Sequence, residues 1–163
     1  MSQRIVIDSL AFAREAGSLQ GKLTIAGLTR LLDYLVDSAG GLTYRVEGKM
    51  GHRSRAQLWL QLDGVLSLSC QRCLEGIEHP IHVRSLLEFV DDEEDLTQEE
   101  IEDDSKDFLP TQKELDVTAL IEDEIILALP IAPCHESCAV PEAGQGTEKI
   151  SPFAVLSGLK GRA

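Results

Sequence analysis

The sequence is poor in aromatic residues and has no long apolar run. Its 163 residues include one tryptophan, two tyrosines and four phenylalanines, so a core must be built mainly from Leu, Ile and Val. The longest uncharged apolar stretch, Ile125–Cys134, is broken by Pro130 and Pro133 and falls well short of the roughly 20 residues that span a bilayer. Charges at Asp8 and Arg14 argue against a signal peptide. We therefore expect a soluble, cytoplasmic protein without a membrane partner.

Motifs for common enzyme chemistries are also missing. The sequence contains no glycine-rich phosphate loop, no G-x-S-x-G and no H-E-x-x-H. Glu122, Asp123 and Glu124 are consecutive in a predicted helix, where neighbouring side chains point apart, so they do not form an acid–base pair. We expect neither enzyme activity nor a small-molecule substrate.

Basic residues are outnumbered, and the imbalance is local. The net charge is −13, from 15 basic and 28 acidic residues. Residues 91–107 hold eleven of the acids and one base, Lys106, so this insert carries −10 and the rest of the chain −3. Such a block predicts a solvated, mobile insert, or alternatively a docking strip for a basic partner such as a ribosomal protein. The nearly neutral remainder leaves room for a basic patch.

Alternating apolar and polar residues predict most of a β-sheet. Strands are expected at Arg4–Ser9, Leu19–Ile25, Leu42–Met50 and Ile77–Phe89. Asp63-Gly64 lies between two further alternating stretches, 56–62 and 65–69, and Asp-Gly favours the two-residue turn of a β-hairpin.

Two segments have helical spacing instead. Apolar residues at i, i+3, i+4, i+7 and i+8 predict a helix over Leu28–Val36. A second helix is expected from an N-cap at Asp116 to Leu129, ended by Pro130.

These elements predict an α+β fold: a mainly antiparallel β-sheet with flanking helices, an acidic mobile insert and an irregular C-terminal tail. We expect an α+β domain over residues 1–130, including the insert at 91–107. Residues 131–163 would form a cysteine-containing loop and the tail, with a short helical turn at Pro152–Leu159.

Four cysteines form two closely spaced pairs. Cys70 and Cys73 lie on a turn between strands, and Cys134 and Cys138 follow a helix. Each pair can bind one metal ion from a turn, which indicates a possible zinc site with His135 as a reserve ligand. The alternative is four reduced thiols without metal. A thiol–disulfide enzyme is disfavoured, because redox Cys-x-x-Cys motifs usually begin a helix and this one lies between strands.

Four basic residues lie within the eleven positions 45–55, and in an antiparallel sheet they could form a patch that contacts RNA phosphates. The candidates for RNA or partner contact are Arg45, Lys49, Arg53, Arg55 and Arg72. An ordinary solvated surface remains the alternative. Trp59 alternates with Gln57 and Gln61, which places it on the polar face, where it could stack on a base or be covered by the Leu28–Val36 helix.

Three segments together resemble the YceD family, the large ribosomal RNA subunit accumulation proteins of bacteria. They are Ser69–Leu74 (SCQRCL), Ile121–Pro130 (IEDEIILALP) and Ser151–Lys160 (SPFAVLSGLK), and an acidic segment precedes the second as in the family. The resemblance implies a cytoplasmic, non-enzymatic protein that supports synthesis, processing or stability of the large-subunit (23S) ribosomal RNA. It implies as partners that RNA, a basic ribosomal protein, or both. The alternative is a zinc-stabilised protein-interaction module without a ribosomal role.

Overall fold

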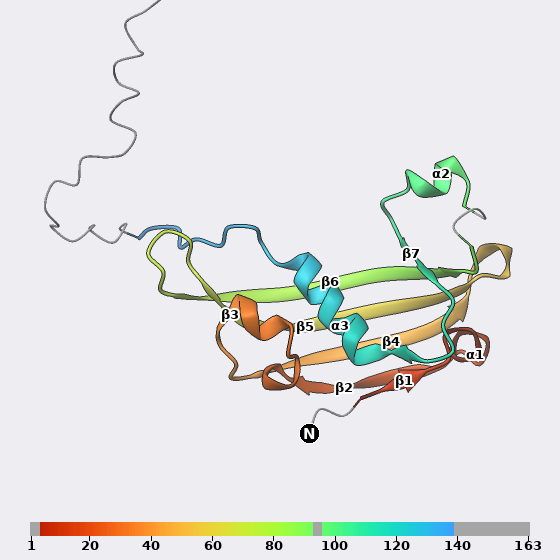
Figure 1. The fold of residues 1–163 in the computed structure, drawn as a ribbon, viewed down its shortest axis with the longest axis horizontal. Helices are drawn as coiled ribbons and strands as arrows, with labels where there is room; N and C mark the ends of the chain where they lie inside the picture. Colours follow the sequence, from red (N-terminus) through yellow and green to blue (C-terminus); the bar gives the residue numbers. More distant parts are fainter. Residues whose placement is uncertain (1–3, 93–95, 139–163) are drawn as a thin grey trace, which may run out of the picture.

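A computed structural model describes residues 4–92 and 96–138 (Figure 1). The strands are β1 (Val6–Ile7), β2 (Ser18–Thr24), β3 (Leu35–Asp37), β4 (Gly41–Met50), β5 (Ala56–Ser69), β6 (Gly76–Val90), β7 (Asp107–Pro110) and β8 (Leu115–Asp116). The α-helices are α1 (Ser9–Arg14), α2 (Gln98–Ile101) and α3 (Val117–Ala128). Three 3-10 turns are η1 (Ile25–Gly27), η2 (Leu31–Tyr34) and η3 (His52–Ser54).

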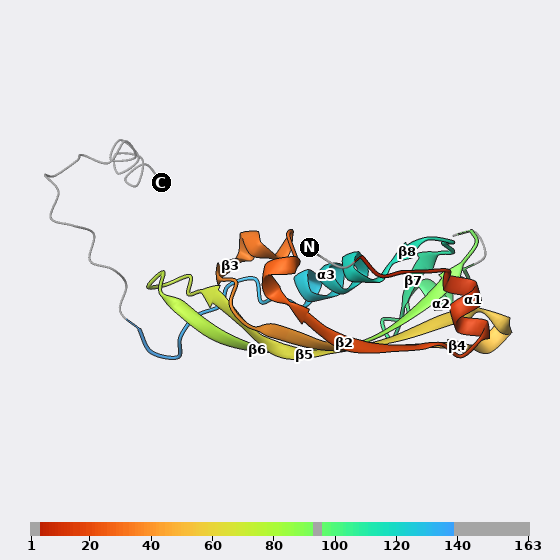
Figure 2. The same cartoon turned by 90° about the horizontal axis from the view of Figure 1, so that it is seen from below.

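One six-stranded sheet organises the molecule and confirms the predicted α+β class. Its strand order is β2-β4-β5-β6-β7, with β3 also paired to β5, and every pairing is antiparallel except that of β6 with β7. Figure 2 shows α1, α3 and the small β1–β8 ribbon on one side of the sheet. We call this side the inner face and the opposite side the outer face.

The core lies between the inner face and α3. Leu58, Leu60, Leu62, Leu66 and Leu68 of β5 are all buried, and they belong to one core cluster with the apolar residues of α3. The expected helix from the Asp116 N-cap is confirmed, because the Asp116 carboxylate accepts from the backbone N–H groups of residues 118 and 119. None of the described helices is long and apolar enough to cross a bilayer.

The predicted hairpin at Asp63-Gly64 is wrong, because β5 runs straight through this dipeptide. The buried leucines before and after it have the same parity, so the alternation never changes phase. β4 pairs with the first part of β5, and β3 with its end. Gly64 is needed for packing, because a Cβ built there would clash with Cδ2 of the buried Leu42.

The predicted Leu28–Val36 helix is also wrong. The segment consists of the η1–η2 connection, η2 and the first residues of β3, whose backbone groups pair with β5. Its turn is held from outside, since one carboxylate oxygen of Glu122 in α3 accepts from the backbone N–H groups of Arg30 (2.6 Å) and Leu31 (3.1 Å). These long-range bonds replace the i to i−4 bonds of a helix.

The N-terminus differs in a similar way. The expected strand Arg4–Ser9 is reduced to β1, and α1 begins at Ser9 with Asp8 as its N-cap, accepting from the Ala11 N–H at 2.8 Å. The strands expected near β2, β4 and β6 are confirmed with small shifts at their ends.

The acidic insert contains regular structure. Thr97 and Glu100 form a capping box at the start of α2, and the chain then returns along β6 as β7. The short helical turn expected at Pro152–Leu159 lies outside the described residues, and the division into residues 1–130 and 131–163 stays a prediction.

Candidate functional site

Two places in the described part of the fold bring together side chains that can bind metal or carry charge. The first is the turn that connects the end of β5 to the start of β6, at one end of the sheet. Cys70 and Cys73 lie on this turn, which is closed by bonds from the Leu74 N–H to the Cys70 carbonyl and from the Cys70 N–H to the Glu75 carbonyl, both 2.9 Å. Leu74 takes a positive φ of 65°, and this lets the chain reverse within a few residues.

The segment that follows α3 packs against this turn. The Gln71 N–H donates to the Pro133 carbonyl at 2.8 Å and fixes the two segments side by side. Cys70 Sγ then lies 3.7 Å from Cys138 Sγ, and Cys73 Sγ lies 3.4 Å from His135 Nδ1. The four donor atoms are all within 4.8 Å of one another, so this cysteine–histidine cluster could hold a metal ion.

The cluster differs from the predicted ligand set by one residue. Cys134 is exposed and lies outside it, and His135, named as a reserve ligand, stands in its place. The sequence signal for this arrangement is the spacing: His135 and Cys138 have two residues between them, as Cys70 and Cys73 do.

The thiols in the cluster are electrostatically unequal. Backbone N–H groups, first that of Cys73 and then those of Arg72 and His135, lower the pKa of Cys70 to about 5 against the opposing effect of burial. Burial, together with the neighbouring Cys70 and Cys73 sulfurs, raises the pKa of Cys138 to about 11. The backbone therefore stabilises a thiolate at Cys70, whereas a second thiolate beside it, at Cys138, would need a nearby positive charge to be stable.

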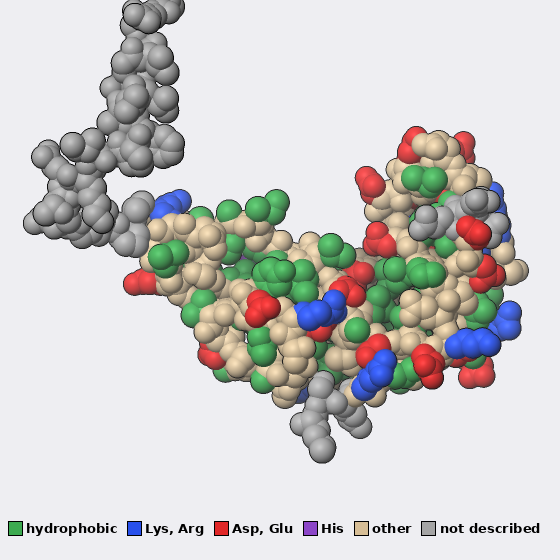
Figure 3. All heavy atoms as spheres, in the orientation of Figure 1, with side chains coloured by type: hydrophobic (Ala, Val, Ile, Leu, Met, Phe, Trp, Pro, Cys, Tyr) green, Lys and Arg blue, Asp and Glu red, His purple; other side chains and the backbone are tan. Residues whose placement is uncertain are grey.

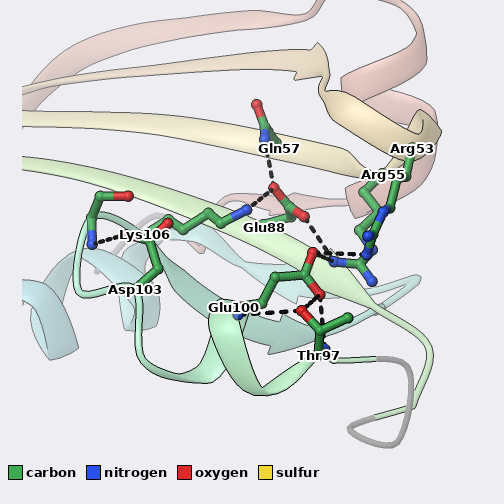
Figure 4. Close-up of polar contacts among 9 residues, drawn as sticks. Arg53, Arg55, Gln57, Glu88, Thr97, Glu100, Asp103 and Lys106 are labelled. Carbon is green, nitrogen blue, oxygen red and sulfur yellow. Dashed lines mark hydrogen bonds and ion pairs between the residues drawn. The ribbon is translucent and has the colours of Figure 1, made fainter.

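The second place is an ion-pair network between the insert and the sheet (Figure 4). Glu88 of β6 is buried and accepts from Gln57 (2.6 Å), Arg55 (3.1 Å) and Lys106 (3.2 Å). Glu100 of α2 pairs with Arg55 as well, at 2.9 Å. Burial alone would raise the pKa of Glu88, but these three donors outweigh it and hold the pKa below its ordinary value.

The predicted RNA-contact residues are separated by this network. Arg53 and Arg55 both pair with Glu100, and the Arg55 side chain is only 13% exposed. Arg72 is exposed on the cysteine turn at the other end of the sheet. The five residues therefore do not form one basic patch.

Arg45 and Lys49 lie on the outer face instead, near Trp59. Lys49 Nζ is 4.4 Å from the centre of the Trp59 ring, and Arg45 pairs with Glu47 at 2.7 Å. Trp59 is 37% exposed. The expected polar face is thus confirmed, and the segment 28–36 does not cover the ring.

An open hollow of about 710 Å³ lies where the end of β6 and β7 meet the segment that carries α2 (residues 96–106, the α2 arm). Its floor and walls are largely apolar, and acidic residues stand at its rim; the lining is Val90, Asp91, Asp92, Leu96, Ile101, Phe108, Leu109 and Pro110. Ile101 is 60% exposed above it. Figure 3 shows acidic side chains over the α2 arm, with apolar ones at its foot. Sequence reasoning missed this hollow, because it depends on how the insert folds back along β6.

The three acids of α3 each have a structural partner. Glu122 holds the η2 turn and Arg30, Asp123 also pairs with Arg30 at 2.6 Å, and Glu124 accepts a short hydrogen bond from the Ser85 hydroxyl. Burial raises the pKa of Glu124, against that hydrogen bond. These contacts give a structural role to each acid in the 121–130 segment.

Comparison with known proteins identifies the family. The family described as large ribosomal RNA subunit accumulation protein YceD matches residues 58–160, from β5 through α3 and beyond. This match covers more than half of the chain and includes both the cysteine turn and the insert, so the protein belongs to the YceD family. No solved structure matches the fold.

Proposed function

We propose that this protein supports accumulation of the large-subunit (23S) ribosomal RNA as a non-enzymatic, cytoplasmic factor that binds a basic protein of the large subunit. The family match supports the process, and the acid-rimmed hollow beneath α2 supports the partner. A basic ribosomal protein is prone to non-specific association with RNA, and a complementary acidic surface can hold it until its site is ready.

The charge distribution favours a basic partner at this end of the molecule. Glu100 pairs with both of the nearest arginines, Arg53 and Arg55, and the ten other acids of the insert outnumber these two cations. Exposed acids remain in the insert around the hollow's lining residue Asp91, among them Glu99 and Asp104 on and after α2. A polyanion would be repelled here, whereas a Lys/Arg-rich segment would be attracted over about a Debye length, roughly 8 Å at physiological salt.

The hollow adds an apolar contact to this attraction. Phe108, Leu109 and Ile101 can receive one apolar side chain of the partner, while the acids around them pair with its basic residues. A buried apolar anchor inside a charged rim is the usual arrangement of a specific protein interface.

The test is binding of purified large-subunit ribosomal proteins to the whole chain and to two charge variants. The insert variant is Asp91→Asn, Glu99→Gln and Asp104→Asn; the control, with the same change in net charge, is Glu15→Gln, Glu75→Gln and Glu78→Gln on exposed positions elsewhere. We expect the insert variant to lose about tenfold in affinity or more and the control to lose less than about threefold. Equal losses would show that only net charge matters and would contradict the proposed surface.

Direct RNA contact is the second candidate, favoured by the exposed Trp59 beneath Lys49 on the outer face. On this hypothesis, polyanions compete for binding, and Trp59→Ala weakens binding of single-stranded 23S segments by about five- to hundredfold. The basic-partner proposal predicts competition by polycations instead, with no effect of Trp59→Ala.

A further inference from the structure

We propose that Cys70, Cys73, His135 and Cys138 bind one Zn²⁺ ion as a structural site that fastens the segment after α3 to the end of the β5–β6 hairpin. The inference rests on the geometry of the cysteine–histidine cluster and is independent of the proposed function. Cys134, the fourth cysteine of the chain, takes no part.

The distances suit a tetrahedral zinc ion. With zinc–sulfur bonds of about 2.3 Å and zinc–nitrogen bonds of about 2.0 Å, two thiolates lie about 3.8 Å apart and a thiolate lies about 3.5 Å from an imidazole nitrogen. The observed separations are 3.7 Å for Cys70 Sγ to Cys138 Sγ and 3.4 Å for Cys73 Sγ to His135 Nδ1. Since all four donor atoms lie within 4.8 Å of one another, shifts of about 1 Å complete the coordination shell.

The histidine is oriented as a ligand. His135 Nε2 lies 3.2 Å from the Gly76 carbonyl oxygen, which can only accept, so the ring proton sits on Nε2. The other nitrogen, Nδ1, then presents its lone pair to the cluster, where it faces Cys73. A histidine that donates to a backbone carbonyl and binds metal through its other nitrogen is the usual arrangement in zinc sites.

The turn that carries Cys70 and Cys73 is preformed, and its backbone donates to one ligand sulfur. The Arg72 N–H points to Cys70 Sγ at 3.4 Å, and the turn that carries both cysteines is closed by its own hydrogen bonds. Both ligand pairs, Cys70 with Cys73 and His135 with Cys138, are separated by two residues, so each pair can hold the ion from one turn.

The site is closed and therefore structural. Three cysteines and a histidine fill four tetrahedral positions and leave none for a substrate. The ligands come from segments about 60 residues apart in sequence, joined here by the Gln71–Pro133 hydrogen bond. The ion would fix the turn that exposes Arg72 and Leu74 against the segment that follows α3.

The test is zinc analysis of the purified, reduced full chain. We expect about one zinc per chain in the wild type and in the matched control Cys134→Ser, but less than about a tenth of an equivalent in Cys70→Ser and Cys138→Ser. Co²⁺ in place of zinc should give the visible absorption of a tetrahedral thiolate site in the wild type and in Cys134→Ser.

A thiol titration on the folded wild type keeps the proposal testable if the serine variants fail to fold. Of the four cysteines, one should react before chelation and all four after it. A chain without metal, a Cys70–Cys138 disulfide in freshly purified protein, or equal zinc loss in Cys134→Ser and Cys70→Ser would overturn the site. None of these three results bears on ribosomal protein binding, so the zinc site and the proposed function can be contradicted separately.

Discussion

At the scale of single residues, two buried glutamates have opposite surroundings. Glu88 is surrounded by donors from Gln57, Arg55 and Lys106, and its pKa lies below the ordinary value of 4.5. Glu124 is buried with one hydroxyl donor, from Ser85, and its pKa lies above that value. Glu88 is therefore held as a carboxylate, and the charged form of Glu124 is penalised by the fold.

The first prediction concerns Glu88→Gln. Removing this charge leaves Arg55 and Lys106 without their buried partner, so we expect a loss of about 3 kcal/mol in the free energy of unfolding at pH 7, measured by urea titration. The loss should shrink below pH 4.5, because the unfolded state then binds a proton that folded Glu88 resists, and the wild type loses the same stabilisation. Glu47→Gln, which breaks an exposed pair with Arg45, should cost less than about 1 kcal/mol. Equal costs would contradict the network.

The second prediction concerns Glu124→Gln, with the opposite pH dependence. Folded Glu124 keeps its proton to a higher pH than the unfolded chain, so the wild type loses stability as pH rises above 4.5. The amide oxygen of glutamine can still accept from Ser85, and glutamine does not titrate. The stability of Glu124→Gln relative to the wild type should therefore increase from pH 5 to pH 8 in urea unfolding. A relative stability that falls over this range would show that the carboxylate is favoured by the fold.

At the scale of elements, the sequence predicted what depends on neighbouring residues and missed what depends on distant ones. The α3 helix follows from its Asp116 cap, its apolar side and Pro130, all local signals. The segment 28–36 has helical spacing, but Glu122 and β5 supply its hydrogen bonds from far along the chain. Asp63-Gly64 resembles a turn in the sequence. A glycine that leaves room for the Leu42 side chain cannot be distinguished, from sequence alone, from a glycine that adopts a positive φ in a turn.

The third prediction tests the continuous β5 strand. Gly64→Ala places a methyl group against the buried Leu42, so we expect a loss of about 1–2 kcal/mol in the free energy of unfolding. Most of that loss should disappear in a Leu42→Ala background, because the close contact is gone. Gly76→Ala meets nothing closer than 3.6 Å and should change stability by less than about 0.5 kcal/mol. A Gly64→Ala cost that is the same in both backgrounds would argue against packing at this point.

At the scale of the whole molecule, the fold places two different candidate sites at opposite ends of one sheet. The cysteine–histidine cluster lies where β5 meets β6, and the charged insert lies beside the start of β5 and the end of β6. The sequence indicated both, as paired cysteines and as a charge block. The two-residue spacing of His135 and Cys138 is a sequence signal for His135 over Cys134. The sequence did not indicate the pairing of Arg53 and Arg55 with the insert, because this pairing depends on contacts between distant segments.

The most direct test of the account is the ratio of large- to small-subunit ribosomal RNA in cells that lack this protein. We predict a lower ratio, restored by the intact gene and by the control variant Glu15→Gln, Glu75→Gln and Glu78→Gln, but not by the insert variant Asp91→Asn, Glu99→Gln and Asp104→Asn. An unchanged ratio in the cells that lack the protein would contradict its role in large-subunit RNA accumulation. A ratio restored equally by both variants would contradict the role of the acidic surface.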